Sequence, residues 1–367
     1  MTTPVLEAAA SAQRDALAER IFKATIESFE LLHLYVGERL GLYRALADLG
    51  GANAAELAAA AGVAERYARE WLEQQAVAGV VEVTEDPDGE AARRYRLPTG
   101  HAEVLLDGDS ESYMAPLTRG VASVARTIPA VLEAFRSGGG VPYEDYGPDL
   151  RASIALLNRP MFLNQLASRW LPALPALHAR LQADPPAQVA DVGCGAGWSS
   201  IAIALAYPKA TVHGLDLDEA SITEARRNAA EAGVADRVAF EVRDAADPSL
   251  AGRFDLVCAF ETVHDMADPV AALRAMRALR ADGGVALVGD EKVAEAFTAP
   301  GDELERFNYG WSALHCLPSG MVQQPSAGTG TVMRPATLRR YARQAGFAEV
   351  GVLPIEHDFW RFYRLAG

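Results

Sequence analysis

Hydrophobic and polar positions follow different patterns in the two halves of this chain. Up to about residue 182, apolar residues recur at helical spacing, with one alternating segment at 80–98 that predicts a β-hairpin. From Gln188 onward, short apolar runs alternate with amphipathic helical segments, the pattern of a parallel sheet covered by helices. We therefore expect a mostly helical region followed by an α/β region.

The helical region predicts a winged-helix layout. A short helix, a turn at Gly62 and a second helix from about Ala64 to Ala78 precede the hairpin, whose turn is expected at Asp86–Gly89. Helices follow from residue 111 to about 182, broken near 137–148 by a Gly/Pro/Tyr-rich segment that serves as a linker or a lid. These boundaries predict three parts, over residues 1–110, 111–185 and 186–367.

Seven strands are expected in the α/β region. The last two adjoin through a short link and should pair antiparallel at one side of the sheet. The strands are predicted over residues 188–193, 211–216, 238–243, 254–260, 284–291, 348–355 and 359–365.

A glycine loop, VADVGCGAGWSS, directly follows the first of these strands and precedes a helix. Its Gly193, Gly195 and Gly197 let the backbone bend sharply and approach a ligand at the helix N-terminus. A dinucleotide-binding fingerprint requires its third glycine one position later, where Trp198 stands. The pattern, which begins at Asp191, therefore favours a ligand other than a pyrophosphate.

Two carboxylates follow the next two strands and strengthen this interpretation. Asp216 ends the second strand, where a carboxylate can accept hydrogen bonds from both hydroxyls of a ribose. Asp244 follows the third strand, where a side-chain acceptor can accept a hydrogen bond from an adenine amino group. Asp218 stands where a helix N-cap belongs, so we assign it to capping.

At these residues the chain resembles the class I S-adenosylmethionine-dependent methyltransferases, in particular the small-molecule branch that carries an N-terminal winged-helix dimerisation domain. The resemblance covers nearly the whole chain from about residue 20 and looks closest to an actinobacterial subgroup. It implies an α/β, Rossmann-like, seven-stranded and mostly parallel sheet with one antiparallel strand. It also implies S-adenosylmethionine as cofactor, bound by Asp191, Gly193, Gly195, Gly197, Asp216, Asp244, Ala245 and Phe260.

The segment FETVHDM matches the family's His-Asp-Trp region after the fourth strand, where the histidine acts as general base. His264 and Asp265 match this motif, so the resemblance implies that both are catalytic, whereas Met266 replaces the tryptophan that covers the adenine. Methyl transfer from a sulfonium is an in-line displacement that depends mainly on alignment, and an imidazole titrates in the range a base needs. Asp265 either orients His264 or caps the following helix.

Substrate contacts are expected from Tyr143 and Tyr146 on the Gly/Pro loop and from Trp311 and His315 in the insertion FNYGWSALHCLPSG. Two histidines and a carboxylate, His264, Asp265 and His315, would also suit a facial metal site, as in metal-using C-methyltransferases. We favour the simpler alternative without a metal, in which His315 binds substrate by a hydrogen bond. The acceptor atom, oxygen, nitrogen or carbon, stays open, with a hydroxyl favoured.

The charge and the cysteine content of the chain limit the binding partners and the compartment that we expect. The 34 Lys and Arg residues against 49 Asp and Glu give a net charge of −15, which opposes binding to nucleic acid. The second winged-helix helix alternates glutamates with arginines, so we expect a homodimerisation module rather than a cofactor-sensing transcriptional regulator, the alternative of another class. Three dispersed cysteines, no signal-peptide pattern and no bilayer-length apolar run predict a cytoplasmic protein without membrane contact.

Overall fold

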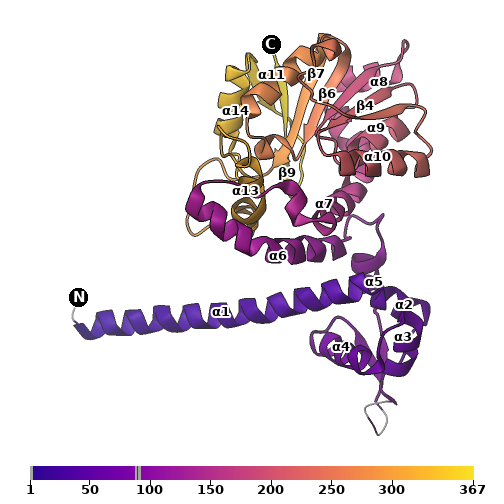
Figure 1. Ribbon diagram of the computed structural model, residues 1–367, viewed down its shortest axis with the longest axis vertical. Helices are drawn as coiled ribbons and strands as arrows, with labels where there is room; N and C mark the ends of the chain where they lie inside the picture. Colours follow the sequence, from indigo (N-terminus) through magenta and orange to yellow (C-terminus); the bar gives the residue numbers. More distant parts are fainter. Residues whose placement is uncertain (1–2, 87–88, 90–91) are drawn as a thin grey trace. The chain divides into compact units, whose positions relative to one another are not determined.

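The computed structural model describes residues 3–86, 89 and 92–367, and it divides into two compact units, Met1–Ala122 and Ser123–Gly367 (Figure 1). Most of the connector predicted over residues 111–185 thus belongs to the second unit. The hairpin turn expected at Asp86–Gly89 includes Pro87 and Asp88, which lie outside the described residues. Among the described helices, none combines the length and the hydrophobicity that crossing a bilayer requires.

The first unit has the helix, turn, helix and hairpin order of a winged helix. A capping box, formed by the side chains of Asn53 and Glu56, starts α3, and Gly62 ends it with a left-handed φ of 68°. A small core with Leu46, Leu57 and Trp71 joins these helices. The elements are α1 (Thr3–Arg39), α2 (Leu42–Asp48), α3 (Ala54–Ala61), α4 (Glu65–Val77), β1 (Glu82–Glu85), antiparallel β2 (Arg94–Arg96) and α5 (Thr99–Leu106).

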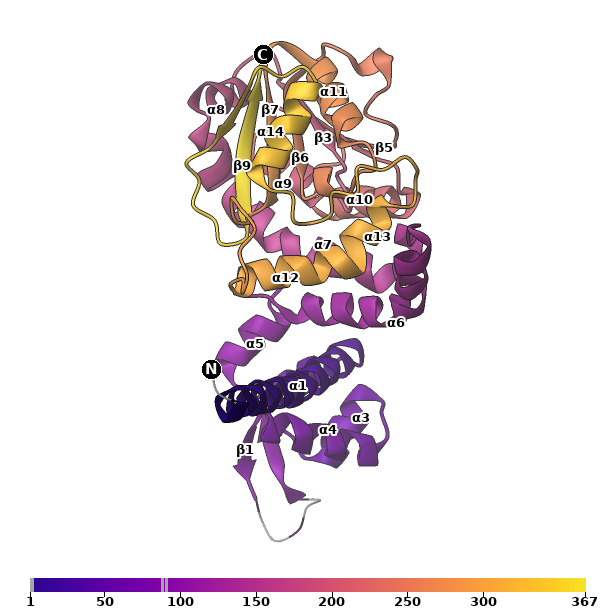
Figure 2. The ribbon, with the colours of Figure 1, turned by 90° about the vertical axis from the view of Figure 1, so that its left-hand side faces the viewer.

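The 37-residue helix α1 is long for this small core. It contacts α2 and α4 near its C-terminal end, and most of its length extends away from them (Figures 1 and 2). Its large apolar side chains are consequently exposed to between 38% and 67% at Leu17, Ile21, Phe22, Ile26, Phe29, Leu32 and Val36.

The second unit contains a seven-stranded sheet in the order β5-β4-β3-β6-β7-β9-β8. Only β9 among these strands runs opposite to the others, since it pairs antiparallel with both β7 and β8. This confirms the predicted mostly parallel sheet with one antiparallel strand. The strands are β3 (Gln188–Val192), β4 (Thr211–Asp216), β5 (Val238–Val242), β6 (Phe254–Phe260), β7 (Arg280–Glu291), β8 (Glu349–Val352) and β9 (Trp360–Ala366).

Helices cover both faces of this sheet, as the continuous apolar strands require. One core packs the sheet against α8 (Pro175–Gln182), α9 (Trp198–Ala206), α10 (Glu219–Glu231) and the π-helical segment η3 (Phe162–Trp170). The other core packs it against α11 (Pro269–Leu279) and α14 (Pro335–Gln344).

Further helical segments precede, connect or follow these elements between residues 115 and 320. They are α6 (Ala115–Ser137), η2 (Tyr143–Tyr146), α7 (Pro148–Met161), η4 (Leu171–Ala173), η5 (Pro248–Leu250), η6 (Val263–Asp265), α12 (Glu303–Trp311), the π-helical η7 (Ser312–Cys316) and α13 (Leu317–Gly320).

Candidate active site

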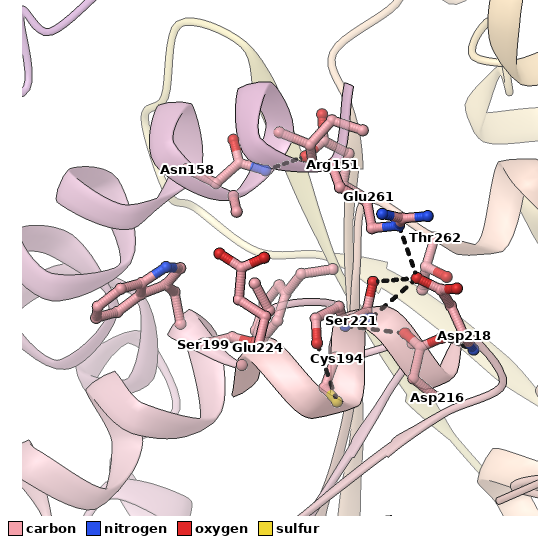
Figure 3. Close-up of a pocket in the computed structure, with 18 of the residues that line it drawn as sticks. Arg151, Asn158, Cys194, Ser199, Asp216, Asp218, Ser221, Glu224, Glu261 and Thr262 are labelled. Atoms are coloured by element: carbon pink, nitrogen blue, oxygen red, sulfur yellow. Dashed lines mark hydrogen bonds and ion pairs between the residues drawn. The ribbon is translucent and has the colours of Figure 1, made fainter. Parts of the chain in front are cut away.

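A cavity of about 220 Å³ opens at the carboxyl ends of β3, β4 and β6 (Figure 3). Open α/β sheets bind ligands at this edge. Its charged lining is mostly acidic, because one arginine faces five carboxylates. The lining residues that carry charge are Arg151, Asp216, Asp218, Glu224, Glu261 and Asp265.

The glycine loop forms one wall of the cavity, and its backbone explains why glycines stand there. Gly193, Gly195 and Gly197 all have left-handed φ values, of 69°, 51° and 82°. A Cβ at Gly193 would overlap with Thr262, and one at Gly197 would overlap with Phe240. The loop therefore presents bare backbone to the cavity at the start of α9, as predicted.

Asp216 is fixed by backbone donors at the edge of the cavity. Its carboxylate accepts hydrogen bonds from the N–H groups of Gly195 and Asp218, both at 2.9 Å. Burial raises the pKa of Asp216, although these hydrogen bonds oppose the rise. Asp218 caps α10 as expected, by accepting from the Ser221 N–H at 3.0 Å, and it also pairs with Arg151 at 3.0 Å (Figure 3).

Three predicted cofactor residues do not line this cavity. Asp191 is buried behind the loop, where its carboxylate accepts from the hydroxyls of Ser199 at 2.5 Å and Ser200 at 2.7 Å and so anchors the start of α9. Asp244 is exposed and accepts from the Ala246 N–H at 2.8 Å, while Ala245 packs against the sheet core. The loop after β5 thus folds onto itself instead of reaching the cavity, whereas Phe260 lines the cavity as predicted.

His264 lies in η6 and is only 2% exposed, held between two carboxylates. Its Nδ1 contacts Asp290 Oδ1 at 2.8 Å, and its Nε2 lies 3.2 Å from Asp265 Oδ1. Burial alone would lower the pKa of His264, but these two carboxylates outweigh burial and raise it well above its usual value. Asp265 lines the cavity, and His264 lies outside the cavity lining.

His315 is buried in η7 among aromatic rings. Its ring centroid lies 4.7 Å from that of Tyr146, 5.9 Å from that of Tyr143 and 6.2 Å from that of Trp311. Its Nδ1 contacts the Cys316 sulfur at 3.4 Å, while its Nε2 has no hydrogen-bond partner in the described part of the chain. Burial lowers the pKa of His315 below its usual value, so the imidazole is neutral near pH 7.

The metal site considered from the sequence is not assembled from its predicted ligands. Among the residues that the structure describes, the group whose ligand atoms all lie within 4.8 Å of one another consists of His264, Asp265 and Cys316, with Cys316 in the place expected for His315. Burial raises the pKa of the Cys316 thiol to about 12, which disfavours the thiolate that a metal needs.

The two tyrosines of the Gly/Pro loop have different surroundings. Tyr143 lines the cavity, as expected for a substrate contact. Tyr146 is fully buried and donates a hydrogen bond to the Leu314 carbonyl at 2.9 Å, so it has a packing role, contrary to the expectation from its loop position. Trp311 is half-buried and also lies outside the cavity lining.

Sequence reasoning missed several cavity residues, and Glu261 is the most informative of them. It follows β6 directly, so the rule that singled out Asp216 at the end of β4 applied to it as well. Its side chain accepts a hydrogen bond from the Asn158 amide, which α7 brings to the cavity (Figure 3). Arg151 and Glu224, also missed, lie on helices whose amphipathic pattern gives no sign of a site.

Comparisons with known proteins agree with the fold described above. Residues 183–325 match a family described as "Methyltransferase domain", and residues 29–106 match an "Rv2258c-like winged HTH domain". The ubiquinone biosynthesis O-methyltransferase of Bordetella bronchiseptica is 31% identical over 175 residues, which cover 47% of this chain and 66% of that relative. The enzyme of the same name from Bordetella avium is 31% identical over 185 residues, 49% of this chain and 70% of the relative.

Solved structures share the fold over nearly the whole chain. The mitomycin 7-O-methyltransferase has a TM-score of 0.73 at 19% identity and covers 97% of this chain and 99% of its own. An O-methyltransferase from neocarzinostatin biosynthesis, solved with S-adenosyl-L-homocysteine and 1,4-dihydroxy-2-naphthoic acid, has a TM-score of 0.62 at 22% identity and covers 92% of this chain and 96% of its own.

Proposed function

Because the chain belongs to the S-adenosylmethionine-dependent methyltransferases, we propose that it methylates a hydroxyl group of a small molecule. The observation that carries the proposal is the cavity itself, which joins a bare glycine loop, the carboxylate of Asp216 and an acidic wall. The relatives that match over the catalytic half are named O-methyltransferases, which favours oxygen over nitrogen or carbon as the acceptor.

The cofactor is S-adenosylmethionine, which supplies an electrophilic methyl group on a positively charged sulfur. The residues of the cavity fit this molecule. The N-terminus of α9 and the loop N–H groups suit its amino-acid carboxylate, and Asp216 suits its ribose hydroxyls. The excess of carboxylates in the lining suits its sulfonium charge.

The acceptor must lose a proton, and His264 is the proposed base, as the family resemblance implies. In the arrangement described above, both imidazole nitrogens contact carboxylates and the raised pKa keeps the ring charged. As an imidazolium His264 has no free nitrogen, so it can accept a proton only after Asp265 turns from Nε2 towards the cavity that it already lines and Nε2 releases its proton to solvent. Asp290 holds the ring in place throughout.

We also propose a homodimer formed through the first unit, in a reducing compartment such as the cytoplasm. The exposed apolar residues of α1 continue into an apolar groove of about 400 Å³, lined by Val36 of α1, by Leu40 just after it, and by Tyr67, Ala68 and Trp71 of α4. A second copy would cover this surface. The three cysteines are buried and unpaired, which suits that compartment.

Two measurements test the proposed activity, and a third tests the dimer. Calorimetry with S-adenosylhomocysteine should show one site per chain, and its absence would refute cofactor binding. A panel of hydroxyl and amine compounds, including 1,4-dihydroxy-2-naphthoic acid, should then give a methyl-sized mass gain from labelled cofactor on the hydroxyl compounds. A gain confined to amines would reassign the acceptor.

Light scattering that reports a monomer at micromolar concentration would refute the dimer.

A further inference from the structure

Glu261 has an unusual backbone conformation at the point where β6 meets the cavity. Its φ is 53°, and among the described residues it is the one residue other than glycine in the left-handed region. Its N–H still donates to the Gly289 carbonyl at 2.8 Å, so the chain turns immediately after the strand pairing ends. A side chain with a Cβ is unfavourable there, and such strain persists where the surroundings impose it, often at functional sites.

The carboxylate of Glu261 is held by two neighbours inside the protein. The Asn158 amide of α7 donates to Oε2, and the side chain of Glu291, at the end of β7, bonds to the same carboxylate. Glu291 is 8% exposed, and burial together with the nearby Glu261 raises its pKa well above its usual value. Glu291 therefore keeps its proton and donates a hydrogen bond to the Glu261 carboxylate, so Glu261 carries the charge of this pair.

Other charged groups around Glu261 leave this charge without a close cationic partner in the cavity. His264 and Asp265 of η6 act on it with opposite signs. Arg151 of α7 lies in the same lining but pairs with Asp218, and Asp216 of β4 adds a further negative charge. Burial raises the pKa of Glu261, which indicates that its ionised form is under-compensated.

The position of Glu261 along the cavity wall brings it to the loop expected to receive the methyl donor. The next residue, Thr262, packs so closely on Gly193 that no Cβ fits there. Both Glu261 and Gly193 line the cavity. The carboxylate thus stands beside the loop that receives a cationic cofactor and releases an uncharged product, since the sulfonium becomes a thioether when the methyl group leaves.

We propose that Glu261, positioned by Asn158 and Glu291, distinguishes the cationic methyl donor from the neutral product and so favours exchange of one for the other. The inference rests on the proposed function. A carboxylate that gains a cationic partner binds the donor tightly, and after the charge is lost the same buried carboxylate disfavours the product. Glu261 is thereby a residue that sets specificity between two states of one ligand.

The test compares the affinities of S-adenosylmethionine and S-adenosylhomocysteine by calorimetry between pH 5 and 8.5. In the wild type, the ratio of the donor affinity to the product affinity should rise with pH and level off once Glu261 is ionised in the product-bound protein as well. Donor binding should release protons and product binding should not. We expect the ratio to change by about tenfold, because a tenfold difference in affinity corresponds to a pKa that differs by about one between the donor-bound and product-bound protein. In Glu261→Gln, the ratio should be constant and near its low-pH value.

Matched variants separate this effect from general disturbance. Glu261→Asp retains a carboxylate and a residue type that tolerates positive φ, so it should retain a pH-dependent ratio. Glu291→Gln keeps a donor for Glu261 and removes no charge, because Glu291 is protonated in this pair, so the midpoint of the pH dependence should stay near the wild-type value. Glu231→Gln, at the end of α10 and exposed, should match the wild type.

The outcomes distinguish the inference from the proposed function. A wild-type ratio that does not change with pH would overturn the role of Glu261, as would an unchanged pH dependence in Glu261→Gln. If the Gln variant does not fold, the wild-type and Glu261→Asp titrations still decide the matter. Failure of the wild type to bind either ligand would instead refute the proposed function.

Discussion

The two sides of the cavity are built in different ways. The glycine-loop side, residues 191–218, comes from one stretch of chain and offers mostly backbone groups and the carboxylate of Asp216. The histidine side brings together buried titratable side chains from three separate segments, 261–265, 290–291 and 315–316. A loop that binds by its backbone can be recognised locally, whereas a buried charge cluster depends on contacts between distant segments. The chemistry that selects an acceptor is expected on the second side.

The largest expected effect separates catalysis from cofactor binding. His264→Gln should lower turnover of whichever panel compound is methylated by about two to four powers of ten, the range for losing a general base. Affinity for S-adenosylhomocysteine should stay near wild type, because His264 lies outside the cavity lining. Initial rates and calorimetry on the same preparation check both values.

The double variant His264→Gln/Asp290→Asn is the control for this experiment. Removing the imidazole alone leaves Asp290 buried without a charged partner, which is costly. The double variant keeps hydrogen-bonding groups without the charges. If either protein loses cofactor affinity in proportion to activity, the two sides of the cavity do not act separately.

The reverse experiment breaks the glycine-loop side. Asp216→Ala should weaken S-adenosylhomocysteine binding by about 1.5–3 kcal/mol, the value of a charge-assisted hydrogen bond. Turnover at saturating cofactor should change little.

Asp244→Ala is a useful comparison, because the family resemblance assigns Asp244 to the adenine while the structure leaves it exposed outside the cavity wall. An Asp244→Ala effect as large as that of Asp216→Ala would mean that the loop after β5 closes over the ligand.

A third prediction uses pH to measure the charge cluster. The pKa of His264 is raised in the folded protein, so its contribution to stability is complete below the ordinary histidine value and is lost as pH rises through the folded value. The free energy of unfolding should therefore fall as the pH rises above about 6.5, by about 1.4 kcal/mol for each pH unit until the folded pKa is reached. Denaturant unfolding at a series of pH values between about 6.5 and 9 measures this slope.

Variants assign the slope to particular groups. His264→Gln should flatten it, because the glutamine side chain does not titrate. Glu291, whose pKa is also raised, acts in the same direction, so Glu291→Gln measures its share. A slope unchanged in both variants would mean that other groups produce it.

The smallest expected effect concerns the backbone of Glu261. Glu261→Gly should be more stable than Glu261→Ala by about 1 kcal/mol, because glycine adopts a φ of 53° without steric strain. Denaturant unfolding of the two variants measures the difference. Equal stabilities would show that the left-handed conformation costs nothing here and that the site stores no strain at this residue.

The sheet was predictable because each strand shows its role locally. Continuous apolar runs such as 254–260 identify strands covered on both faces, and the glycines at 193–197 mark the strand-to-helix turn. The antiparallel pairing of β8 and β9 followed from their short link. All of these features depend on residues within one or two elements.

The histidine side was less predictable for a physical reason. Asp290 pairs with His264 across 26 positions, and Tyr146 bonds to the Leu314 carbonyl across 168, so no local pattern marks either contact. Asp191 was expected among the cofactor ligands from its place in the glycine motif, but the direction of its side chain depends on the serines of α9. The residue types predicted which segments lie near the cavity, but the packing of the side chains determines which of their atoms reach it.

The buried thiols of the second unit can be used to measure how often parts of that unit open to solvent. Cys194 lies in the glycine loop, Cys258 in β6, and Cys316 beside His315, and all three are shielded from solvent. The first unit contains no cysteine. A thiol-labelling reagent can therefore react only when the sheet or the cavity walls open, and the rate at each sulfur measures the free energy of that local opening. Ligands that close the glycine loop should slow labelling of Cys194 in particular. The time course of alkylation at each cysteine therefore measures how often that part of the cavity opens.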